Sequence, residues 1–291
     1  MTKINNIILM SDANNFSVKE AINPYYTQNN VDINKATAEH KDIQNLLTEA
    51  GVKVITVPSP IDSQDGVYTA NWGLVRGNKA ILARLPSARK QEEAYAEKIL
   101  MNLGKQVFHV PDYYKFSGQG DALVCGNLLF CGSKYRSDEE AQRFAADTLG
   151  YERVQLETIP LTDSNGQIVI NSSSGWPDSY FYDLDMALAI IKAPSDNNKG
   201  LIAYCPEAFI PVSRELLSNL ENIEKIEVSI DEAKNAFATN LVSTGEIVIM
   251  SANAPKLAES LRQYGLKVVT PEITELSKGG GFIRCMTLTI D

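Results

Sequence analysis

Long apolar runs are absent from this 291-residue sequence. Stretches such as 7–10 and 247–250 are far shorter than the roughly 20 residues that a membrane-spanning helix needs. The first residues, MTKINNIILM, turn polar at Ser11 and lack the long apolar core and the small-residue cleavage site of a secretory signal. We therefore expect no transmembrane segment and a cytoplasmic location.

Histidine and closely paired cysteine are scarce. The chain has two histidines, His40 and His109, and four cysteines without a C-x-x-C pair, Cys125, Cys131, Cys205 and Cys285. A zinc site needs several such ligands at close spacing, so the sequence predicts neither a metal nor another cofactor. Cys125 and Cys205 stand in apolar, strand-like segments, which is typical of a small buried hydrophobic residue.

Positive charge is in deficit. Lys and Arg number 27 against 36 Asp and Glu, which gives a net charge of -9. The resulting field repels nucleic-acid phosphates and anionic membranes, so neither is an expected partner. The hydrophobic fraction of 44% is enough for a large core, and no shift of composition divides the chain, so we expect one domain over residues 1–291. The composition does not distinguish a monomer from a homo-oligomer, so a homo-oligomer stays one of the alternatives.

Short β-branched runs alternate with helical patterns along the chain. One predicted helix, INKATAEHKDIQNLLTEAG, ends on the C-cap signal Gly51. Another, SDEEAQRFAADTLG, has Ser137 as its expected N-cap and Glu140 at the third helical position. Between them, DALVCGNLLFCG is a predicted hairpin with the two-residue turn Gly126-Asn127. The recurring unit is therefore strand, strand, helix, strand.

Degenerate copies of this unit follow one another to the end of the chain. Each copy alone has too little apolar face to be stable, so the pattern favours an α/β fold in which copies pack around an axis. The segment 162–177, TDSNGQIVINSSSGWP, is rich in Ser, Asn and Gly and is predicted to form a hairpin or surface loop. Such a loop is placed well to cover a site.

Cys285 differs from the other cysteines because of the glycines before it, in KGGGFIRCMTL. Adjacent glycines let the backbone approach another group closely or adopt positive φ, at an entropic cost that needs a reason. A thiolate is the best side-chain nucleophile near neutral pH, and Arg284 or oriented backbone amides can lower its pKa. The residues alone are consistent with either a nucleophile or a core cysteine that follows a loop.

Spaced motifs in a fixed order resemble the amidinotransferase, dimethylarginine dimethylaminohydrolase and arginine dihydrolase superfamily, whose fold is the pentein. The matching segments and their key residues are INPYY with Asn23, DGVYTANWG with Asp65 and Asn71, Arg89, FSGQGDAL with Asp121, GSKYR with Arg136, and GGFIRCMTL with Cys285. The resemblance covers essentially the whole chain, and arginine dihydrolases are the branch with the best agreement. It implies a five-bladed α/β propeller built from degenerate ββαβ repeats.

The resemblance also implies a reaction and an arginine-like substrate. The thiolate of Cys285 attacks the guanidinium carbon, and the covalent adduct is then hydrolysed or transferred. Arg89 and Arg136 are expected to clamp the substrate carboxylate by paired hydrogen bonds. The residues expected to hold the amidine N–H groups are the aspartates Asp65 and Asp121 and the asparagines Asn23, Asn71 and Asn240.

Two positions depart from the family pattern. Asp183, in FYDLD, stands where the family has a histidine, and Ser117, in FSGQGDAL, stands where it has a glutamate. The family histidine is a general acid and base, and an aspartate can replace it as proton donor only if burial or a carboxylate such as Asp185 raises its pKa. His40 and His109 lie outside the position of the family base.

These departures leave competing hypotheses. The first is a Cys-dependent hydrolase or amidinotransferase that acts on a C–N bond, with Cys285 as nucleophile, Asp183 as modified base and Ser117 in the substrate pocket. The second is a catalytically impaired protein that binds an arginine-like metabolite or a protein partner. A third is that Asp183 is an introduced residue.

Overall fold

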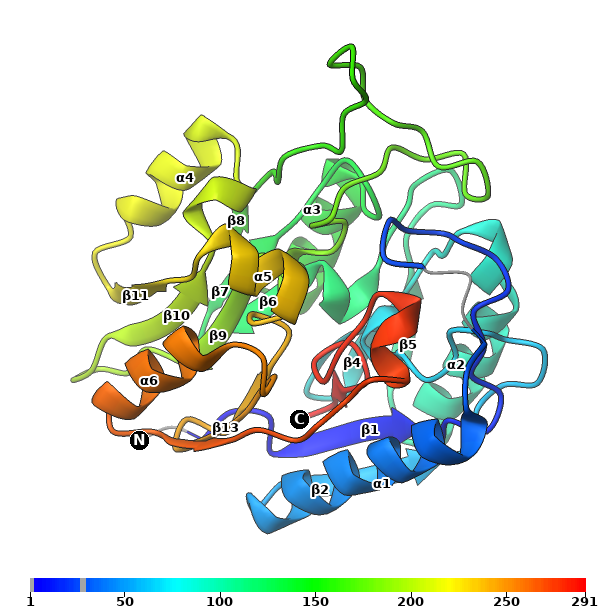
Figure 1. Ribbon diagram of the computed structural model, residues 1–291, viewed down its shortest axis with the longest axis horizontal. Helices are drawn as coiled ribbons and strands as arrows, with labels where there is room; N and C mark the ends of the chain where they lie inside the picture. The colour runs from blue at the N-terminus through cyan, green and yellow to red at the C-terminus, as the bar shows by residue number, and fades with distance from the viewer. Residues whose placement is uncertain (1–2, 27–29) are drawn as a thin grey trace.

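The computed structural model describes residues 3–26 and 30–291, and its strands form five sheets of three strands (Figure 1). In these sheets lie β1 (Ile7–Ser11), β2 (Lys53–Val57) and β15 (Leu288–Thr289); β3 (Gly73–Arg76), β4 (Lys79–Leu82) and β5 (Gln106–His109); β6 (Ala122–Cys125), β7 (Leu128–Cys131) and β8 (Glu152–Gln155); β9 (Leu188–Lys192), β10 (Gly200–Tyr204) and β11 (Ile223–Glu227); and β12 (Val242–Ser243), β13 (Ile247–Ile249) and β14 (Lys267–Val269).

Every sheet repeats one connection. Two strands pair antiparallel, a helix follows, and the third strand pairs parallel to the second. The crossover helices are α1 (Ile33–Glu49), α2 (Gln91–Asn102), α3 (Glu139–Leu149), α4 (Pro211–Ser218) and α6 (Pro255–Gln263), while α5 (Ile230–Ala236) joins two sheets. Among residues 3–26 and 30–291, no helix combines the length and apolar character that crossing a bilayer requires.

The sheets close into a ring because β15 pairs antiparallel with β1, with Leu288 opposite Leu9. The first strands of successive sheets also contact each other, as β15 does with β3, β6 with β9, and β9 with β12. The predicted five-bladed propeller of ββαβ repeats is thereby confirmed. Large buried side chains such as Trp72, Phe130 and Phe209 fill the space between sheets and helices.

The turn and capping residues predicted from the sequence agree with the structure at Gly126 and differ from it at Ser137. Gly126 has φ +65 in the turn between β6 and β7, as the predicted hairpin requires. The predicted N-cap Ser137 is wrong by one residue, because Asp138 precedes α3. Ser137 is fully buried instead, and its hydroxyl accepts a hydrogen bond from the Ser117 amide at 3.1 Å. The Ser137 side chain therefore forms a hydrogen bond in the protein interior and does not cap α3.

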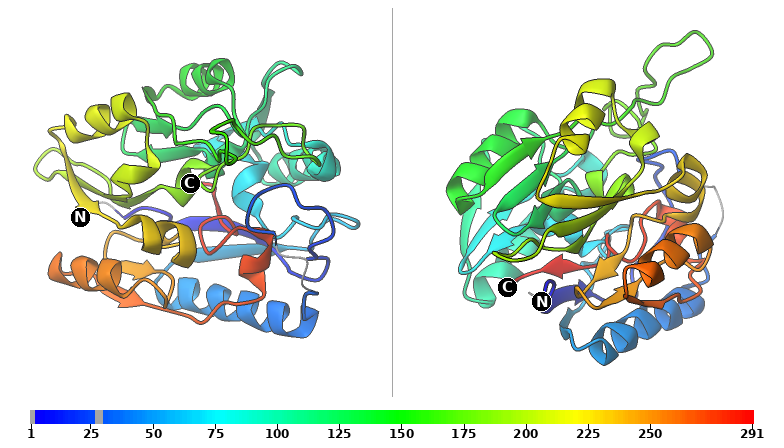
Figure 2. Two further views of the ribbon diagram at one scale, coloured as in Figure 1. Left: turned by 45° about the horizontal axis from the view of Figure 1, so that its top comes forward. Right: turned by 90° about the vertical axis from the view of Figure 1, so that its left-hand side faces the viewer.

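The loop 162–177 stands out from the body of the protein (Figure 2). Isolated bridges join Thr162 to Ile168 and Ile170 to Pro177, so it is an irregular hairpin, as predicted. Its base turns back over the propeller, where Trp176 lies near Arg136.

Candidate active site

Five turns, each directly before the first strand of a blade, bring the predicted residues together. The 3-10 helices η1 (Thr69–Trp72), η3 (Gly118–Gly120) and η4 (Leu184–Met186) precede β3, β6 and β9, and irregular turns precede β12 and β15. These turns and the residues that flank them carry Asn71, Ser117, Asp183, Asn240 and Cys285. The repeat therefore builds the site, because equivalent positions of the blades meet at one end of the ring.

The Cys285 thiol is held by an amide and a carboxylate. Asn240 donates from Nδ2 to the sulfur at 3.0 Å, and its Oδ1 accepts from the Cys285 amide at 3.1 Å. On the other side the thiol donates to Oδ2 of Asp185 at 3.3 Å. The thiol thus has a carboxylate neighbour that can accept its proton, although Asp185 was not among the predicted site residues.

Asp183 lies beside Asn71, whose Nδ2 donates to its Oδ2 at 2.8 Å. The same amide donates to Oγ of Ser117 at 2.9 Å. The close approach requires Gly120, because a Cβ at that position would lie 2.7 Å from Asp183 Oδ2 and 2.4 Å from Asn71 Nδ2. Within the described residues, Oδ1 of Asp183 has no hydrogen-bond partner, so this buried oxygen is available to a ligand.

The two arginines differ in how fully they are bonded. Arg89 donates from Nε and Nη2 to Glu92 at 2.9 and 2.7 Å, and from Nη1 to Oδ1 of Asn71 at 2.8 Å. Arg136 donates to the Ile22 carbonyl, and its guanidinium lies 5.0 Å from the centroid of the Tyr182 ring. Arg89 therefore orients the Asn71 amide, whereas the Ile22 carbonyl is the only hydrogen-bond partner of Arg136 among residues 3–26 and 30–291.

Asp65 and Asn23 also line the site. Tyr26 donates its hydroxyl proton to Asp65 Oδ1 at 2.5 Å, and burial raises the pKa of Asp65 to about 6 despite the nearby Arg89 guanidinium. Asn23 donates to the Gly279 carbonyl at 3.0 Å, next to Gly280. Gly280 has φ +85, and a Cβ there would lie 2.4 Å from Asn23 Oδ1, so this glycine is structurally required.

Asp121 lies one layer behind this wall. Its Oδ1 accepts from the Leu184 amide at 3.0 Å, and so fixes the turn that carries Asp183. A Cβ at Gly132 would overlap with Asp121 Oδ1, so the glycine makes room for this carboxylate.

A cavity with an empty volume of about 360 Å³ joins these groups. Eight of the ten predicted residues line it, namely Asn23, Asp65, Asn71, Arg89, Ser117, Arg136, Asp183 and Cys285. Asp121 and Asn240 do not line it and act on residues that do. The cavity is also lined by Tyr68, Tyr182, Leu85 and Pro86, which the sequence motifs did not reveal. The fully buried Glu92 was missed as well, although its i, i+3 spacing from Arg89 is a readable signal.

Burial dominates the electrostatics of the site. It raises the pKa of the Cys285 thiol well above its ordinary value, and the carboxylates of Asp185 and Asp183 raise it further. Burial also raises the pKa of Asp183, while Arg136 and hydrogen bonds from Ser117 and Asn71 restrain the rise. The pKa of Asp185 is likewise raised by burial and then by Asp183. A cation placed among these groups would lower the pKa of each of them.

The remaining candidates lie away from the site. His40 is buried in α1, and burial lowers its pKa to about 4. His109 pairs with Glu97 at 3.0 Å on β5. Cys125 and Cys205 are buried and free, as expected of small core residues, and Cys131 is buried and free as well. Residues 3–26 and 30–291 contain no cluster of three His, Cys, Asp or Glu side chains suited to a metal ion.

Known proteins resemble this chain over nearly all of its length. A family profile described as "N,N dimethylarginine dimethylhydrolase, eukaryotic" matches residues 7–170. The N(G),N(G)-dimethylarginine dimethylaminohydrolase of Mycobacterium tuberculosis is 31% identical over 278 residues, which cover 94% of this chain and 82% of that protein. The bifunctional arginine dihydrolase/ornithine cyclodeaminase AgrE of Nostoc sp. is 30% identical, and the match covers 97% of this chain but 37% of AgrE.

A solved structure gives the same picture. The N-terminal domain of ArgZ, an arginine dihydrolase from cyanobacteria, superposes with a TM-score of 0.83 at 28% identity, over 98% of this chain and 97% of that chain. That structure is of a variant covalently bound to a reaction intermediate. The similarity thus covers nearly the whole N-terminal domain of ArgZ, which is a bifunctional arginine dihydrolase/ornithine cyclodeaminase.

Proposed function

Because this chain belongs to the dimethylarginine dimethylaminohydrolase family of pentein proteins, we propose that it hydrolyses a C–N bond of an arginine-like guanidino compound through a covalent intermediate on Cys285. The observation that carries the proposal is the setting of the thiol. Buried carboxylates surround it, and Arg89 is already paired with Glu92 at 2.7 Å. A guanidinium cation compensates this excess of negative charge, and Arg136 remains to bind the substrate carboxylate by paired hydrogen bonds.

In the first half-reaction, the thiol passes its proton to Asp185 across the 3.3 Å contact, and the sulfur attacks the guanidinium carbon. The cationic substrate assists, because its charge lowers the thiol pKa that burial raises. The C–N bond to the departing amine then breaks as that nitrogen takes a proton from Asp183, and the amidino group remains on sulfur.

In the second half-reaction, water attacks the same carbon and gives a proton to Asp183. The C–S bond breaks, the remaining hydroxyl proton passes to solvent, and the ureido product leaves. Asp185 returns its proton to the sulfur. The role of Asp183 rests on its buried position beside Asn71 and on the raised pKa that a carboxylic proton donor needs.

The test is incubation with arginine, agmatine, citrulline and methylated arginines. We expect ammonia or amine release and an amidino adduct on Cys285 in mass spectra of quenched reactions. Cys285→Ala should lower turnover by more than about 10³-fold and remove the adduct. The absence of both turnover and adduct with every compound of the panel would contradict the proposal. Transfer of the amidino group to an added amine would instead identify an amidinotransferase.

A binding protein is the second candidate, because Asp183 and Ser117 replace the family histidine and glutamate together. It predicts ligand-dependent thermal stabilisation without product. The double variant Asp183→His with Ser117→Glu separates the two candidates. Activity gained only in that variant means that the pocket binds an arginine-like compound and that the natural residues stop the chemistry.

We further infer one domain over residues 1–291, because β1 and β15 share a sheet and so close the ring. The cytoplasmic location expected from the sequence stays a prediction. A homo-oligomer is tested by light scattering of the purified protein.

A further inference from the structure

A second cavity, with an empty volume of about 920 Å³, lies on the other side of the wall that carries Cys285. It shares no lining residue with the active-site cavity. Residues that are one or two positions apart in the sequence line different cavities, so a single layer of backbone separates the two cavities at these points. Arg284 lines the second cavity and Cys285 the first, while Gln119 lines the second and Ser117 the first.

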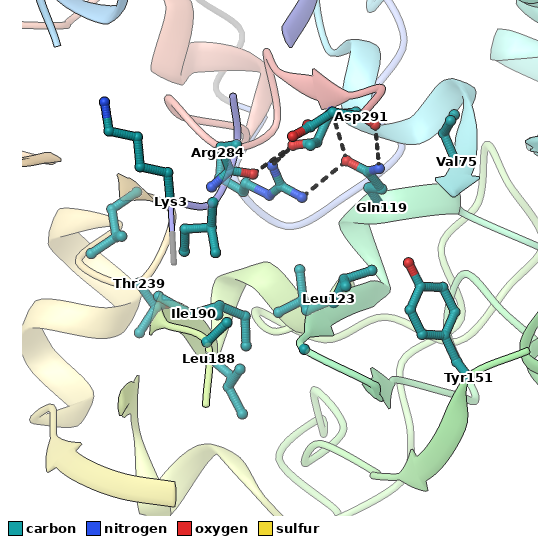
Figure 3. Close-up of a pocket in the computed structure, with 18 residues that line it drawn as sticks. Lys3, Val75, Gln119, Leu123, Tyr151, Leu188, Ile190, Thr239, Arg284 and Asp291 are labelled. Atoms are coloured by element: carbon teal, nitrogen blue, oxygen red, sulfur yellow. Dashed lines mark hydrogen bonds between the residues drawn. The ribbon is translucent and has the colours of Figure 1, made fainter. Parts of the chain in front are cut away.

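One end of the second cavity carries the Arg284 guanidinium, whose pKa is lowered by burial and raised in part by the carboxylate of Asp185. Arg284 donates from Nη2 to Oε1 of Gln119 at 3.0 Å and from Nη1 to Oγ1 of Thr289 at 3.2 Å (Figure 3). Within the described ranges, no salt bridge engages Arg284. The other charged groups that line the cavity are Lys3 and Asp291, and the Asp291 carboxylate already accepts from Asn6. The remaining N–H groups of Arg284 suit an anion.

The walls away from Arg284 are mostly apolar. They include Leu123 and Val124 of β6 and Leu188 and Ile190 of β9. Figure 3 shows Leu123, Leu188 and Ile190 across the cavity from Arg284, with Thr239 beside Ile190. Val124 and Ile190 are only partly buried. A cavity with mostly apolar walls and a smaller number of polar groups has the composition of a small-molecule site.

We propose that this cavity binds a carboxylate with an apolar body, with the carboxylate on Arg284 and the body against β6 and β9. The proposed site shares no lining residue with the active-site cavity, although the charges of Arg284 and Asp185 link the two sites electrostatically. The apolar body contributes by burial, and the guanidinium sets the orientation, favours an anion over a neutral ligand of the same shape and repels a cationic one.

Isothermal titration of the full chain with octanoate, octan-1-ol and octylamine tests this. We expect octanoate to bind at least about tenfold more tightly than octan-1-ol, since one charge-assisted hydrogen-bonded pair is worth more than 1.4 kcal/mol. Octylamine should not bind. Equal binding of the three compounds to the unsubstituted protein, or no binding of octanoate, overturns the proposal. This result decides the matter independently of the variants described next.

Four variants locate the site. Val124→Trp fills the cavity and should abolish octanoate binding, while the matched Val124→Ala leaves it open and should retain binding. Arg284→Gln should weaken octanoate at least tenfold and leave octan-1-ol unchanged, and Arg284→Lys should keep the preference for the anion. Octanoate that binds Val124→Trp as tightly as the unsubstituted protein occupies another site and contradicts the proposal, and circular dichroism confirms that each variant is folded.

Discussion

At the scale of single residues, the thiol of Cys285 is placed for chemistry and yet is held protonated in the free protein. Burial and the carboxylates of Asp185 and Asp183 all raise its pKa. Its reactivity therefore depends on what else occupies the cavity. A cysteine that becomes nucleophilic only beside a cationic substrate is protected from oxidation and alkylation when the site is empty.

This gives a first prediction. Iodoacetamide should alkylate Cys285 slowly at pH 7, and the rate should rise about tenfold per pH unit without a plateau below pH 9. Asp185→Asn removes the nearest anion, lowers the thiol pKa and should speed labelling at any pH below the plateau. Peptide mass spectrometry separates Cys285 from the other cysteines. A plateau below pH 9 in the unsubstituted protein would contradict the raised pKa.

The second prediction concerns Asp183→Asn. Because burial raises the pKa of Asp183 in the folded state, folding binds protons, and stability falls as the pH rises from the unfolded value near 4 through the folded value. The neutral amide should remove this slope, so the variant should gain stability at pH 8 and gain none at pH 4. Turnover should fall by about 10²–10⁴-fold, because the amide cannot donate the proton. Urea unfolding at both pH values and a steady-state assay provide the measurements.

The sequence motifs located the polar wall of the site but not its connections. Spacing between motifs places Asn71 and Cys285 in the same pocket only when a fold is assumed. Asn71 is positioned by a contact with Asp183, 112 residues away, and Cys285 by a contact with Asp185, 100 residues away. The partner of the thiol, Asp185, was overlooked because the motif draws attention to Asp183 two residues earlier. Which of two neighbouring carboxylates faces the sulfur depends on the backbone of η4, which no residue pattern fixes.

At the scale of elements, helix α1 fixes the glycine segment that leads to Cys285. Glu39 accepts hydrogen bonds from the amides of Thr274 and Leu276 at 2.9 and 3.0 Å, and from the amide of Glu275 at 3.0 Å. These residues open the turn η6 (Leu276–Gly279), which precedes Gly280. A charged side chain on a helix thus holds the backbone of a loop from the other end of the chain.

Glu39→Ala should therefore lower the free energy of unfolding by about 1–3 kcal/mol, because buried amides lose their acceptor. It should also raise the alkylation rate of Cys285 at pH 7 by loosening the glycine segment. The matched control is Glu49→Ala, an exposed glutamate of the same helix, which should change stability by less than about 0.5 kcal/mol. Equal effects of the two variants in urea unfolding would exclude the role of Glu39.

Element types follow well from the sequence because the hydrophobic period and the turn glycines act locally. Their ends follow less well, as Ser137 shows. Its position satisfies the N-cap pattern, but its hydroxyl is already engaged by the buried Ser117 amide, so Asp138 takes the helix end. A tertiary hydrogen bond can take up a side chain that would otherwise cap a helix. The sequence alone does not show which of the two contacts is formed.

At the scale of the whole molecule, the ring closes through the short strand β15. Leu288 is fully buried against Leu9 and Trp72 in the core of the first blades. Leu288→Ala should cost about 2–5 kcal/mol of unfolding free energy and open the ring next to Cys285. Leu216→Ala on α4 is the matched control, since Leu216 is 41% exposed and should cost less than about 0.5 kcal/mol. Guanidinium chloride unfolding of both variants measures the difference.

Ring closure also sets the order in which the site is made during synthesis. The carboxylates Asp65, Asp121, Asp183 and Asp185 belong to blades that leave the ribosome first, whereas Cys285 emerges immediately before the strand that closes the first blade. A nascent chain therefore holds the charged half of its site before the thiol exists. The segment that brings the sulfur to Asp185 and Asn240 is therefore the same one that carries β15 to the first sheet.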